Sequence, residues 1–580
     1  MPWAETEAET VGNRLWFGNF TFFLIGCYNI NNCRDALRFY LIKKVVWNMN
    51  ISKDAERISA EVVQRVMDKW ATDPEAVEHA IFDVIYHERR RLETDPMAKA
   101  EDARFYDELN SKALHASYEE QRTLLKYVIQ RFVYEVQGHF NPMVYKMATR
   151  VVPTGLNILL NTLSPLRLIE ELTAGGESFA KQARLIGETG LLKKLARKGT
   201  IVLMPNHVSN LDSVLIGFAL HRLGLPPFSY GAGLNLFSNR IFGFFMHNLG
   251  AYKVDRRKKT AIYKDVLKAY AGVTMELGYH NLFFPGGTRS RSGAVEQRVK
   301  RGLMGTALNA YIHNLVTKKR NPDIFFVPAT INYQLVLEAQ TLIDDFLKDR
   351  GKSRYIIEDD EFSRPRVILE FMRKLFRLHS KVDIVFGRPM DIFGNHVNKD
   401  GQSMDRYGRP IDRTRYVFVN GSPGFDSQRD HEYTMETASA VVREYAKNTV
   451  IKPVNLISHV IMQRLRMENP ELDIYRLIRT GGRLAGIPMN EIYQDLQKKT
   501  ALLIEAENQG RLLLDETIRA NDQVMIMGQA MAHLEAFQTS PVMVRRGDRL
   551  FHQNRKQLLY YGNKLTMHPF METEKKAGDQ

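Results

Sequence analysis

Four short apolar runs in the middle of the chain constrain its fold most strongly. Each has the length and composition of a buried strand and is closed by a loop with Pro or Gly; they are residues 200–204, 281–284, 324–327 and 382–386. Segments of helical periodicity separate the runs. Strands that alternate with helices predict a parallel sheet, because parallel neighbours need a crossover connection. We therefore expect an α/β fold over residues 139–400, with a mixed, largely parallel sheet and flanking helices.

Helical regions are predicted on both sides of this central domain. In the N-terminal region, residues 1–138, apolar residues at three- and four-residue spacing predict helices at 55–70, 74–92 and 117–136. In the C-terminal region, residues 431–570, the same spacing predicts helices at 438–445, 456–467 and, as one long run, 491–537. Residues 401–430 are rich in Gly, Pro, Asp and Arg and predict an irregular connection. The tail, residues 571–580, is expected to be disordered.

Composition and charge limit the class of partner. The 580 residues are 44% hydrophobic and 25% charged, as in ordinary globular proteins. The two cysteines, Cys27 and Cys33, form no disulfide framework or metal pattern, which favours a reducing compartment. The net charge of +15 favours an anionic partner: nucleic acid, lipid headgroups or a phosphorylated substrate. No zinc-finger or RNP-like motif and no basic tract with interleaved aromatics occurs, so nucleic acid is the least favoured of these.

No segment of the sequence predicts a membrane-spanning helix. The charge-free stretches are interrupted by Gly, Pro or Asn and fall short of about 20 continuous apolar residues; they are 15–33, 151–166 and 223–239. The acidic start of the chain also argues against a signal peptide. Residues 142–168 combine Met and Val at helical spacing with Lys146 and Arg150. This stretch is either a helix lying in one leaflet or an ordinary helix packed on its own domain.

The loop after the first run carries a histidine and an aspartate five residues apart. On a straight helix His207 and Asp212 would point about 140° apart, so they meet only if the chain turns between them. A proline ends the strand, and Ser209 or Asn210 can cap a helix that begins at Leu211, which puts Asp212 in the first helical turn. An aspartate that accepts from one imidazole nitrogen leaves the other available as a general base.

The loop after the second run has the composition of an anion site. Gly286 and Gly287 allow backbone amides to approach a ligand closely. Arg289 and Arg291 are guanidinium forks suited to phosphate oxygens, and Ser290 adds a short hydroxyl. The alternative is a surface turn with solvated arginines. An apolar strand that leads directly into Pro-Gly-Gly favours the functional interpretation.

Two further segments fit around these loops. Residues 250–256 follow the apolar stretch 241–246 and end in Arg256, which is either a third cation near a bound phosphate or a surface charge within a basic run. Residues 327–333 are predicted to close the third strand with a proline-bounded turn and to shape the wall of a pocket.

Together these segments resemble the four sequence blocks of the glycerolipid acyltransferases, in the branch of the glycerol-3-phosphate acyltransferases of the bacterial PlsB type. The first block corresponds to residues 206–212 with the His-x4-Asp spacing, and the second to residues 250–256. Residues 287–293 match the third block, whose Arg-Ser-Arg is typical of this branch, and residues 327–333 match the fourth. The resemblance covers at least residues 200–393, with weaker similarities to about residue 570.

The resemblance implies an enzyme that moves a fatty acyl group from a thioester of coenzyme A or an acyl-carrier protein to the hydroxyl of glycerol 3-phosphate, the first step of phospholipid synthesis. It implies a catalytic pair, His207 and Asp212, without a metal or a further cofactor. It also implies that the acceptor is held by Arg256, Gly287, Arg289, Ser290 and Arg291. We expect a peripheral membrane protein at the cytoplasmic face of the inner membrane, in contact with anionic lipids.

One departure from the family pattern leaves the acceptor open. The third block usually has Glu where this chain has Gly286, and the first block begins Asn-His, as in the lysophosphatidate acyltransferase branch. The alternatives are therefore transfer to 1-acylglycerol 3-phosphate or dihydroxyacetone phosphate, or a catalytically inactive lipid-binding protein.

Overall fold

The computed structural model describes most of the chain beyond residue 50. The described residues are 51–95, 100–149, 183–234, 237, 240–349, 381–483, 486–536 and 541–571. All of them belong to one compact unit, Met49–Gln580, which is distinct from a first unit, Met1–Asn48. All but the first residue of the tail 571–580, and most of the stretch 142–168, lie outside the described residues; Met571 itself is helical and buried.

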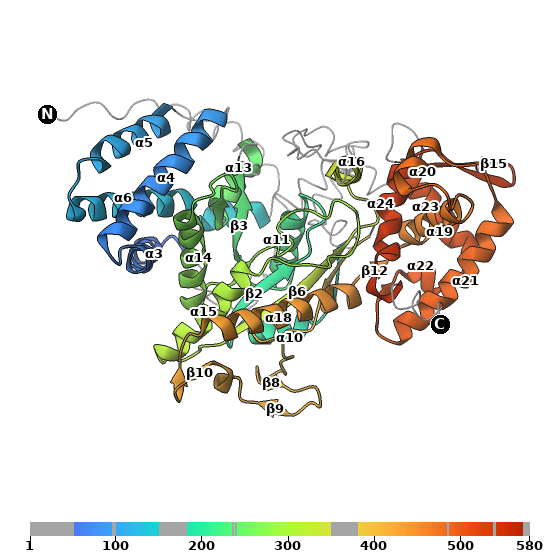
Figure 1. The fold of residues 1–580 in the computed structure, drawn as a ribbon. Coiled ribbons are helices and arrows are strands. Elements are labelled where there is room, and N and C mark those ends of the chain that lie inside the picture. The colour runs from blue at the N-terminus through green and yellow to red at the C-terminus, as the bar shows by residue number, and fades with distance from the viewer. Residues whose placement is uncertain are drawn as a thin grey trace, which may run out of the picture. The chain divides into compact units, whose positions relative to one another are not determined.

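A seven-stranded mixed sheet forms the centre of this unit (Figure 1). Its strand order is β1-β7-β6-β2-β5-β3-β4, and every neighbouring pair is parallel except β6 and β7, which are antiparallel. The strands are β1 Ala183–Gly187, β2 Thr200–Pro205, β3 Ser229–Gly233, β4 Ala251–Val254, β5 Asn281–Leu282, β6 Ile324–Asn332 and β7 Val382–Phe386. The predicted fold class, a mixed and largely parallel sheet with flanking helices, is confirmed.

One strand continues where the sequence predicted a turn. β6 runs through Pro328 to Asn332, so the proline-bounded turn predicted at 327–333 is wrong. Proline lacks only the backbone N–H donor, so it can still accept a hydrogen bond. The Pro328 carbonyl accepts from the Gly387 amide at 2.8 Å, and Pro328 pairs in register with Met204 of β2. Nine consecutive buried residues hold this strand in place, which outweighs the loss of one hydrogen bond.

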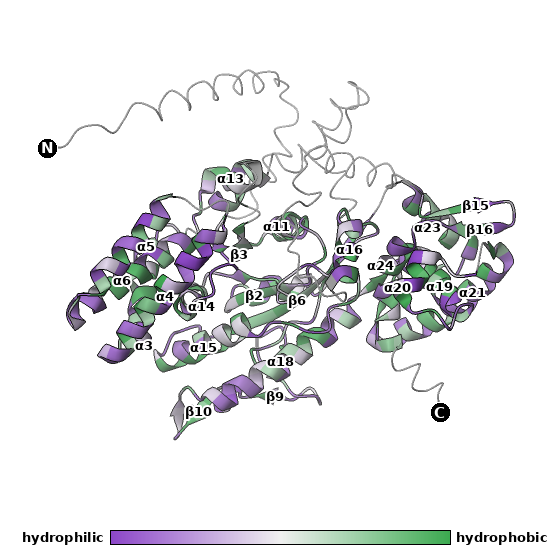
Figure 2. Ribbon diagram, turned by 45° about the horizontal axis from the view of Figure 1, so that its top comes forward, coloured by the Kyte–Doolittle hydropathy of each residue, from purple (hydrophilic) through white to green (hydrophobic). Residues whose placement is uncertain are grey.

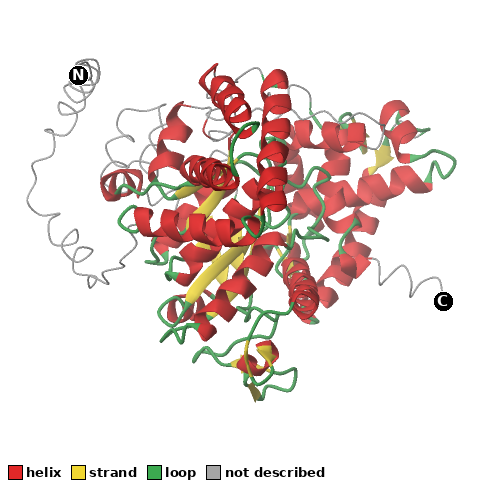
Figure 3. Ribbon diagram, turned by 60° about the vertical axis from the view of Figure 1, so that its left-hand side comes forward, coloured by secondary structure: helices red, strands yellow, loops and turns green. Residues whose placement is uncertain are grey.

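Helices cover the sheet, and Figure 3 shows the strands enclosed by them. They are α10 Thr189–Leu195, α11 Asp212–Arg222, α13 Arg240–Asn248, α14 Ala261–Glu276, α15 Gly302–Val316, α16 Ala339–Asp349 and α18 Ser427–Lys447. One hydrophobic core joins β2 and β6 to three of them, α14, α15 and α18. Figure 1 shows α11 on the opposite side of β2 and β6 from α15 and α18. Of the predicted irregular connection, 401–430, residues 401–426 form only two-residue strands and a short 3-10 helix, and the last four residues begin α18.

The N-terminal region is a helical bundle built on α14. Its helices are α3 Ala55–Trp70, α4 Pro74–Thr94, α5 Ala100–Ala113 and α6 Tyr118–Val136. Their apolar faces share a core with Tyr263, Val266 and Tyr270 of α14. Figure 2 shows the matching alternation of hydrophobic and hydrophilic residues around these helices. The sequence did not predict α5, which buries only Tyr106, Leu109 and Ala113.

The C-terminal region is also helical. Its helices are α19 Pro453–Met467, α20 Ile474–Thr480, α21 Met489–Asn508, α22 Glu516–Arg519, α23 Gln523–Ala536 and α24 Arg555–Thr566. The single helical run predicted at 491–537 is wrong. Gly510 and Asn521 have φ of 67° and 54°, a left-handed conformation that ends a helix, and the chain turns at both. A small antiparallel sheet of β13 Ile487–Pro488, β15 Met543–Arg546 and β16 Arg549–His552 packs in this region.

Within the described residues, none of the helices combines the length and the apolar character that crossing a bilayer would require.

Candidate active site

The predicted functional loops meet at one edge of the sheet. Because β2, β4, β5 and β6 are parallel to one another, their carboxyl ends lie on the same side, where open α/β sheets bind ligands. His207 follows β2, Arg256 follows β4, Arg289 follows β5 and Tyr333 follows β6. Segments up to 126 residues apart in sequence are thereby brought together.

His207 and Asp212 are in direct contact, as predicted. The His207 Nδ1 lies 2.8 Å from the Asp212 Oδ2, and the Asp212 side chain has no exposed surface. The same Oδ2 accepts the backbone amides of Val208 at 2.6 Å and Ser209 at 3.0 Å. These bonds hold Asp212 as an acceptor, which assigns the proton to Nδ1 and leaves Nε2 of His207 available to accept one.

A tyrosine secures the second oxygen of this aspartate. The Tyr333 hydroxyl donates to Asp212 Oδ1 at 2.6 Å. Burial, together with the negative charge of Asp212, raises the pKa of Tyr333 well above its ordinary value, so the hydroxyl remains a donor. Both Asp212 oxygens are therefore occupied, and the carboxylate cannot rotate away from His207 without breaking several bonds.

The turn between His207 and Asp212 is built differently from the prediction. Helix α11 begins at Asp212, and Leu211 occupies the N-cap position without a side-chain hydrogen bond. The predicted cap by Ser209 or Asn210 is therefore wrong. Both residues are instead engaged by Glu338, which accepts from the Ser209 hydroxyl at 2.8 Å and from the Asn210 amide at 2.9 Å.

Glu338 is a site residue that the sequence analysis missed. Its carboxylate is fully buried, and besides the histidine loop it holds Arg289, whose Nη1 lies 3.2 Å from Oε1. One carboxylate thus joins the histidine loop to the arginine loop. The sequence does contain one signal for Glu338: it is a lone acidic residue within the apolar run Leu335 to Ala339, and a buried charge is rare unless it has partners.

The two loops also contact each other directly. The Phe284 ring stacks on the His207 imidazole, with centroids 4.4 Å apart and an interplanar angle of 29°. The Ser290 amide donates to the His207 carbonyl at 2.8 Å. His207 is therefore fixed through its backbone, its ring face and its Nδ1, while its side chain keeps 18% exposure.

The glycines and serine of the arginine loop serve first to shape it. Gly287 has φ of 77°, which few other residues adopt, and its amide donates to the Phe284 carbonyl at 3.0 Å. The Ser290 hydroxyl donates to the Ala294 carbonyl at 2.9 Å. The amide of Gly287 is thus engaged in the turn. Arg291 is half-buried in the same loop.

Arg256 lies near Arg289, as the predicted cation cluster requires. Its side chain is exposed at the surface. Partial desolvation and the positive charge of Arg289 lower the pKa of Arg256. Two guanidinium groups close enough to repel each other form a site that an anion would stabilise.

Glu296 occupies the space beside Gly286. A Cβ added at Gly286 would lie 2.5 Å from Glu296 Oε1, so the absence of a side chain at 286 makes room for this carboxylate. Burial raises the pKa of Glu296 to about 7. The second oxygen, Oε2, is buried without a hydrogen-bond partner among the described residues.

Comparison with known proteins finds similarity over the part of the chain that carries these loops. Residues 189–332 match the family model described as Acyltransferase, which includes β2, the His207 loop, the arginine loop and all of β6. Curated relatives carry the name glycerol-3-phosphate acyltransferase. One from Xanthomonas axonopodis pv. citri is 29% identical over 231 residues, 39% of this chain and 24% of the relative.

Two Pseudomonas relatives with the same name match a longer part of the chain. One from Pseudomonas fluorescens is 25% identical over 291 residues, 49% of this chain and 31% of the relative. One from Pseudomonas aeruginosa is 26% identical over 288 residues, 50% of this chain and 31% of the relative. The chain thus spans only about a quarter to a third of the length of these relatives. The predicted resemblance is confirmed, and residues 189–332 match the Acyltransferase family model.

Proposed function

We propose that the protein transfers a fatty acyl group from an acyl thioester to the hydroxyl of glycerol 3-phosphate. One observation supports this proposal above the others: a histidine oriented by a buried aspartate shares one sheet edge with a cluster of arginines. A general base beside a phosphate site suits an acceptor that carries both a hydroxyl and a phosphate. The names of the relatives favour glycerol 3-phosphate among such acceptors.

The proposed reaction is a direct transfer in two steps. His207 Nε2 takes the proton of the acceptor hydroxyl as its oxygen attacks the thioester carbonyl, forming a tetrahedral intermediate. The intermediate collapses to the ester and expels the thiolate, which takes the proton back from the imidazolium. Asp212 stabilises the imidazolium between these steps through its 2.8 Å bond to Nδ1. General-base catalysis of this kind contributes roughly 10²–10⁴-fold in rate.

The arginines are proposed to bind the phosphate of the acceptor. Burial and the charge of Arg289 lower the pKa of Arg256, and a phosphate dianion bound by both arginines would offset these costs. Arg291, Ser290 and Gly287 complete the proposed acceptor loop. Fixing the phosphate places the hydroxyl at a set distance from His207, which turns a bimolecular encounter into an oriented one.

The acyl donor and the cellular location are parts of the same proposal. We propose a thioester of coenzyme A or an acyl-carrier protein as donor, and a peripheral position on the cytoplasmic face of the inner membrane. The net charge of +15 supports contact with anionic lipids. Such a surface would bring the enzyme to its lipid products.

An acyl-transfer assay tests the function. The purified protein is incubated with acyl-CoA or with an acyl-carrier-protein thioester and, in separate reactions, glycerol 3-phosphate, dihydroxyacetone phosphate and 1-acylglycerol 3-phosphate. We expect transfer to glycerol 3-phosphate above the other two, and its loss in the His207→Ala variant with an unchanged thermal midpoint. Equal activity in that variant, or transfer to none of the acceptors from either thioester, would refute the proposal. An inactive lipid-binding protein would give the second result.

A further inference from the structure

Helix α24 of the C-terminal region contacts the proposed active site. The Asn563 side-chain amide donates to the Ser292 carbonyl at 3.0 Å, on the arginine loop. The Tyr561 hydroxyl accepts from the Val336 amide at 3.2 Å, two residues before Glu338. α24 therefore binds both the loop that carries the arginines and the segment that carries Tyr333 and Glu338.

The arginine loop is shaped to lie directly on this helix. Gly293 has φ of 75°, and a Cβ added there would lie 2.2 Å from the Tyr560 carbonyl oxygen. Only glycine allows that approach. The approach places the Tyr560 side chain beside the arginine loop rather than on the outer surface of the C-terminal region.

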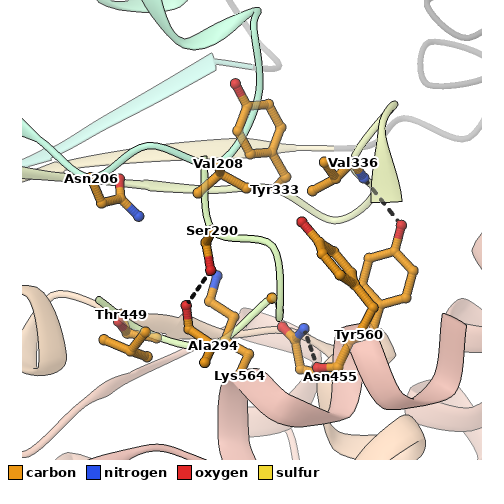
Figure 4. Close-up of a pocket in the computed structure, with 13 residues that line it drawn as sticks. Asn206, Val208, Ser290, Ala294, Tyr333, Val336, Thr449, Asn455, Tyr560 and Lys564 are labelled. Carbon is orange, nitrogen blue, oxygen red and sulfur yellow. Dashed lines mark hydrogen bonds between the residues drawn. The ribbon is translucent and has the colours of Figure 1, made fainter. Parts of the chain in front are cut away.

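A small cavity lies between α24 and the two loops (Figure 4). It holds about 40 Å³ and is lined by Asn206, Val208 and Ser290 from the loops, Tyr333 and Val336, and Tyr560, Tyr561 and Lys564 of α24, among others. None of its lining residues is a carboxylate. This space fits about three water-sized groups, which suits the polar end of a small molecule and is too small for an acyl chain.

The Tyr560 hydroxyl points into this cavity. Figure 4 shows it directed toward the space between Ser290 and Tyr333. Tyr560 is 2% exposed, and its hydroxyl has no hydrogen-bond partner among the described residues. A buried hydroxyl without a partner costs roughly 1–3 kcal/mol, so a donor at this place needs a compensating role.

The charges around Tyr560 are those of the proposed active site. After burial and the neighbouring Tyr561, the groups that influence the Tyr560 pKa are Glu338, Arg289 and Asp212. Lys564 lines the cavity, and its Nζ donates to the Asn332 side chain at 3.0 Å. A hydroxyl donor that feels the charge of Arg289 and shares a cavity with Lys564 suits an anionic oxygen.

We propose that α24 completes the acceptor site and that the Tyr560 hydroxyl donates a hydrogen bond to a phosphate oxygen of the acceptor bound at Arg289. This inference rests on the proposed function, and it adds a residue from the C-terminal region to the site. The ligand class is a small phosphate monoester, whose phosphate oxygens the cavity would take while the rest of the molecule lies outside it.

Tyr560→Phe tests the assignment, because it removes the hydroxyl and keeps the ring. We expect the KM for glycerol 3-phosphate to rise about tenfold, the loss of one hydrogen bond to a charged group, with the KM for acyl-CoA unchanged and the thermal midpoint no lower than that of the wild type. Two variants serve as controls. Tyr106→Phe removes another buried hydroxyl without a partner, in α5, and should change neither constant. Tyr561→Phe breaks the bond to Val336 and should lower the midpoint.

Calorimetric titration with inorganic phosphate gives a second readout that needs no acyl transfer. The wild type should bind phosphate about ten times more tightly than Tyr560→Phe. Equal phosphate affinity, or an unchanged KM, would overturn the assignment of Tyr560 even if transfer to glycerol 3-phosphate is observed. A drop in thermal midpoint with equal losses for both substrates would also overturn it. If the wild type transfers no acyl group but its phosphate binding still depends on Tyr560, the proposed function is overturned and the assignment of Tyr560 to a phosphate site stands.

Discussion

At the scale of single residues, one buried carboxylate organises each half of the site. Asp212 holds the imidazole and two backbone amides, and Glu338 holds the same loop together with Arg289. Asp212 could be predicted from sequence because it lies five residues from His207, within one loop. Glu338 could not, because its partners are 49 and about 128 residues away and only the fold brings them together.

Glu338→Gln should weaken both the site and the fold. Glutamine retains one acceptor oxygen, but it loses the negative charge opposite Arg289. We expect the free energy of unfolding to fall by about 2 kcal/mol and kcat/KM to fall about ten- to a hundredfold, because the two loops lose their common anchor. Urea unfolding and the transfer assay measure these. Glu444→Gln, at another buried glutamate, is the control and should leave kcat/KM unchanged. Equal activity losses in both variants would contradict a specific role for Glu338.

Glu296 should make stability depend on pH. Burial raises its pKa from 4.5 to about 7, so the folded state favours the protonated form. Its contribution to stability is present below pH 4.5 and is lost as the pH rises through 7. Glu296→Gln removes the cost of ionisation. The thermal midpoint of the variant, relative to wild type, should therefore rise between pH 5 and pH 8. A difference that stays constant across this range would show that the carboxylate ionises without cost.

At the scale of elements, strands were more predictable than their ends. The predicted runs 200–204 and 382–386 match β2 and β7 within one residue, because strands at the centre of a covered sheet are mostly apolar. β6 extends beyond Pro328 because neighbouring strands on both sides hold its backbone. The run 491–537 was predicted as one helix because helical spacing does not reveal left-handed turns such as those at Gly510 and Asn521. Local patterns thus identify elements, whereas tertiary contacts determine where they end.

Two glycine substitutions test whether the contact between the arginine loop and α24 matters for stability and activity. Gly293→Ala must adopt a positive φ and displace the Tyr560 carbonyl, so we expect a lower thermal midpoint and reduced transfer. Gly217→Ala in α11 is the matched control. A Cβ at Gly217 meets nothing within 4 Å, and the free energy of unfolding should rise by about 0.5–1 kcal/mol with activity retained. A neutral Gly293→Ala would show that α24 and the arginine loop are not closely coupled.

At the scale of the whole compact unit, a buried charge network fastens the C-terminal helices to the sheet. Lys452, at the start of α19, is fully buried, and its Nζ lies 2.6 Å from Asp383 of β7 and 3.4 Å from Asp515. Arg184 of β1 also pairs with Asp383. Burial alone would raise the pKa of Asp383, but the Lys452 and Arg184 charges lower it. This network holds α19, and with it α24, beside the active-site edge.

The charge of the whole chain predicts membrane adsorption. With a net charge of +15, the protein should sediment with vesicles that contain an anionic phospholipid and should not sediment with neutral vesicles. Raising the salt from about 50 mM to about 500 mM should release most of it, because screening shortens the range of the attraction. Binding that depends on neither the lipid charge nor the salt concentration would contradict electrostatic adsorption and indicate apolar insertion.

The most direct measurement is kcat/KM for acyl transfer by four proteins: wild type, His207→Ala, Asp212→Asn and the double variant. If Asp212 acts through His207, its substitution should reduce kcat/KM in the wild type and change little once His207 is absent. His207→Ala alone should cost roughly 10²–10⁴-fold. Independent costs that multiply in the double variant would contradict the account, as would a His207→Ala protein as active as the wild type.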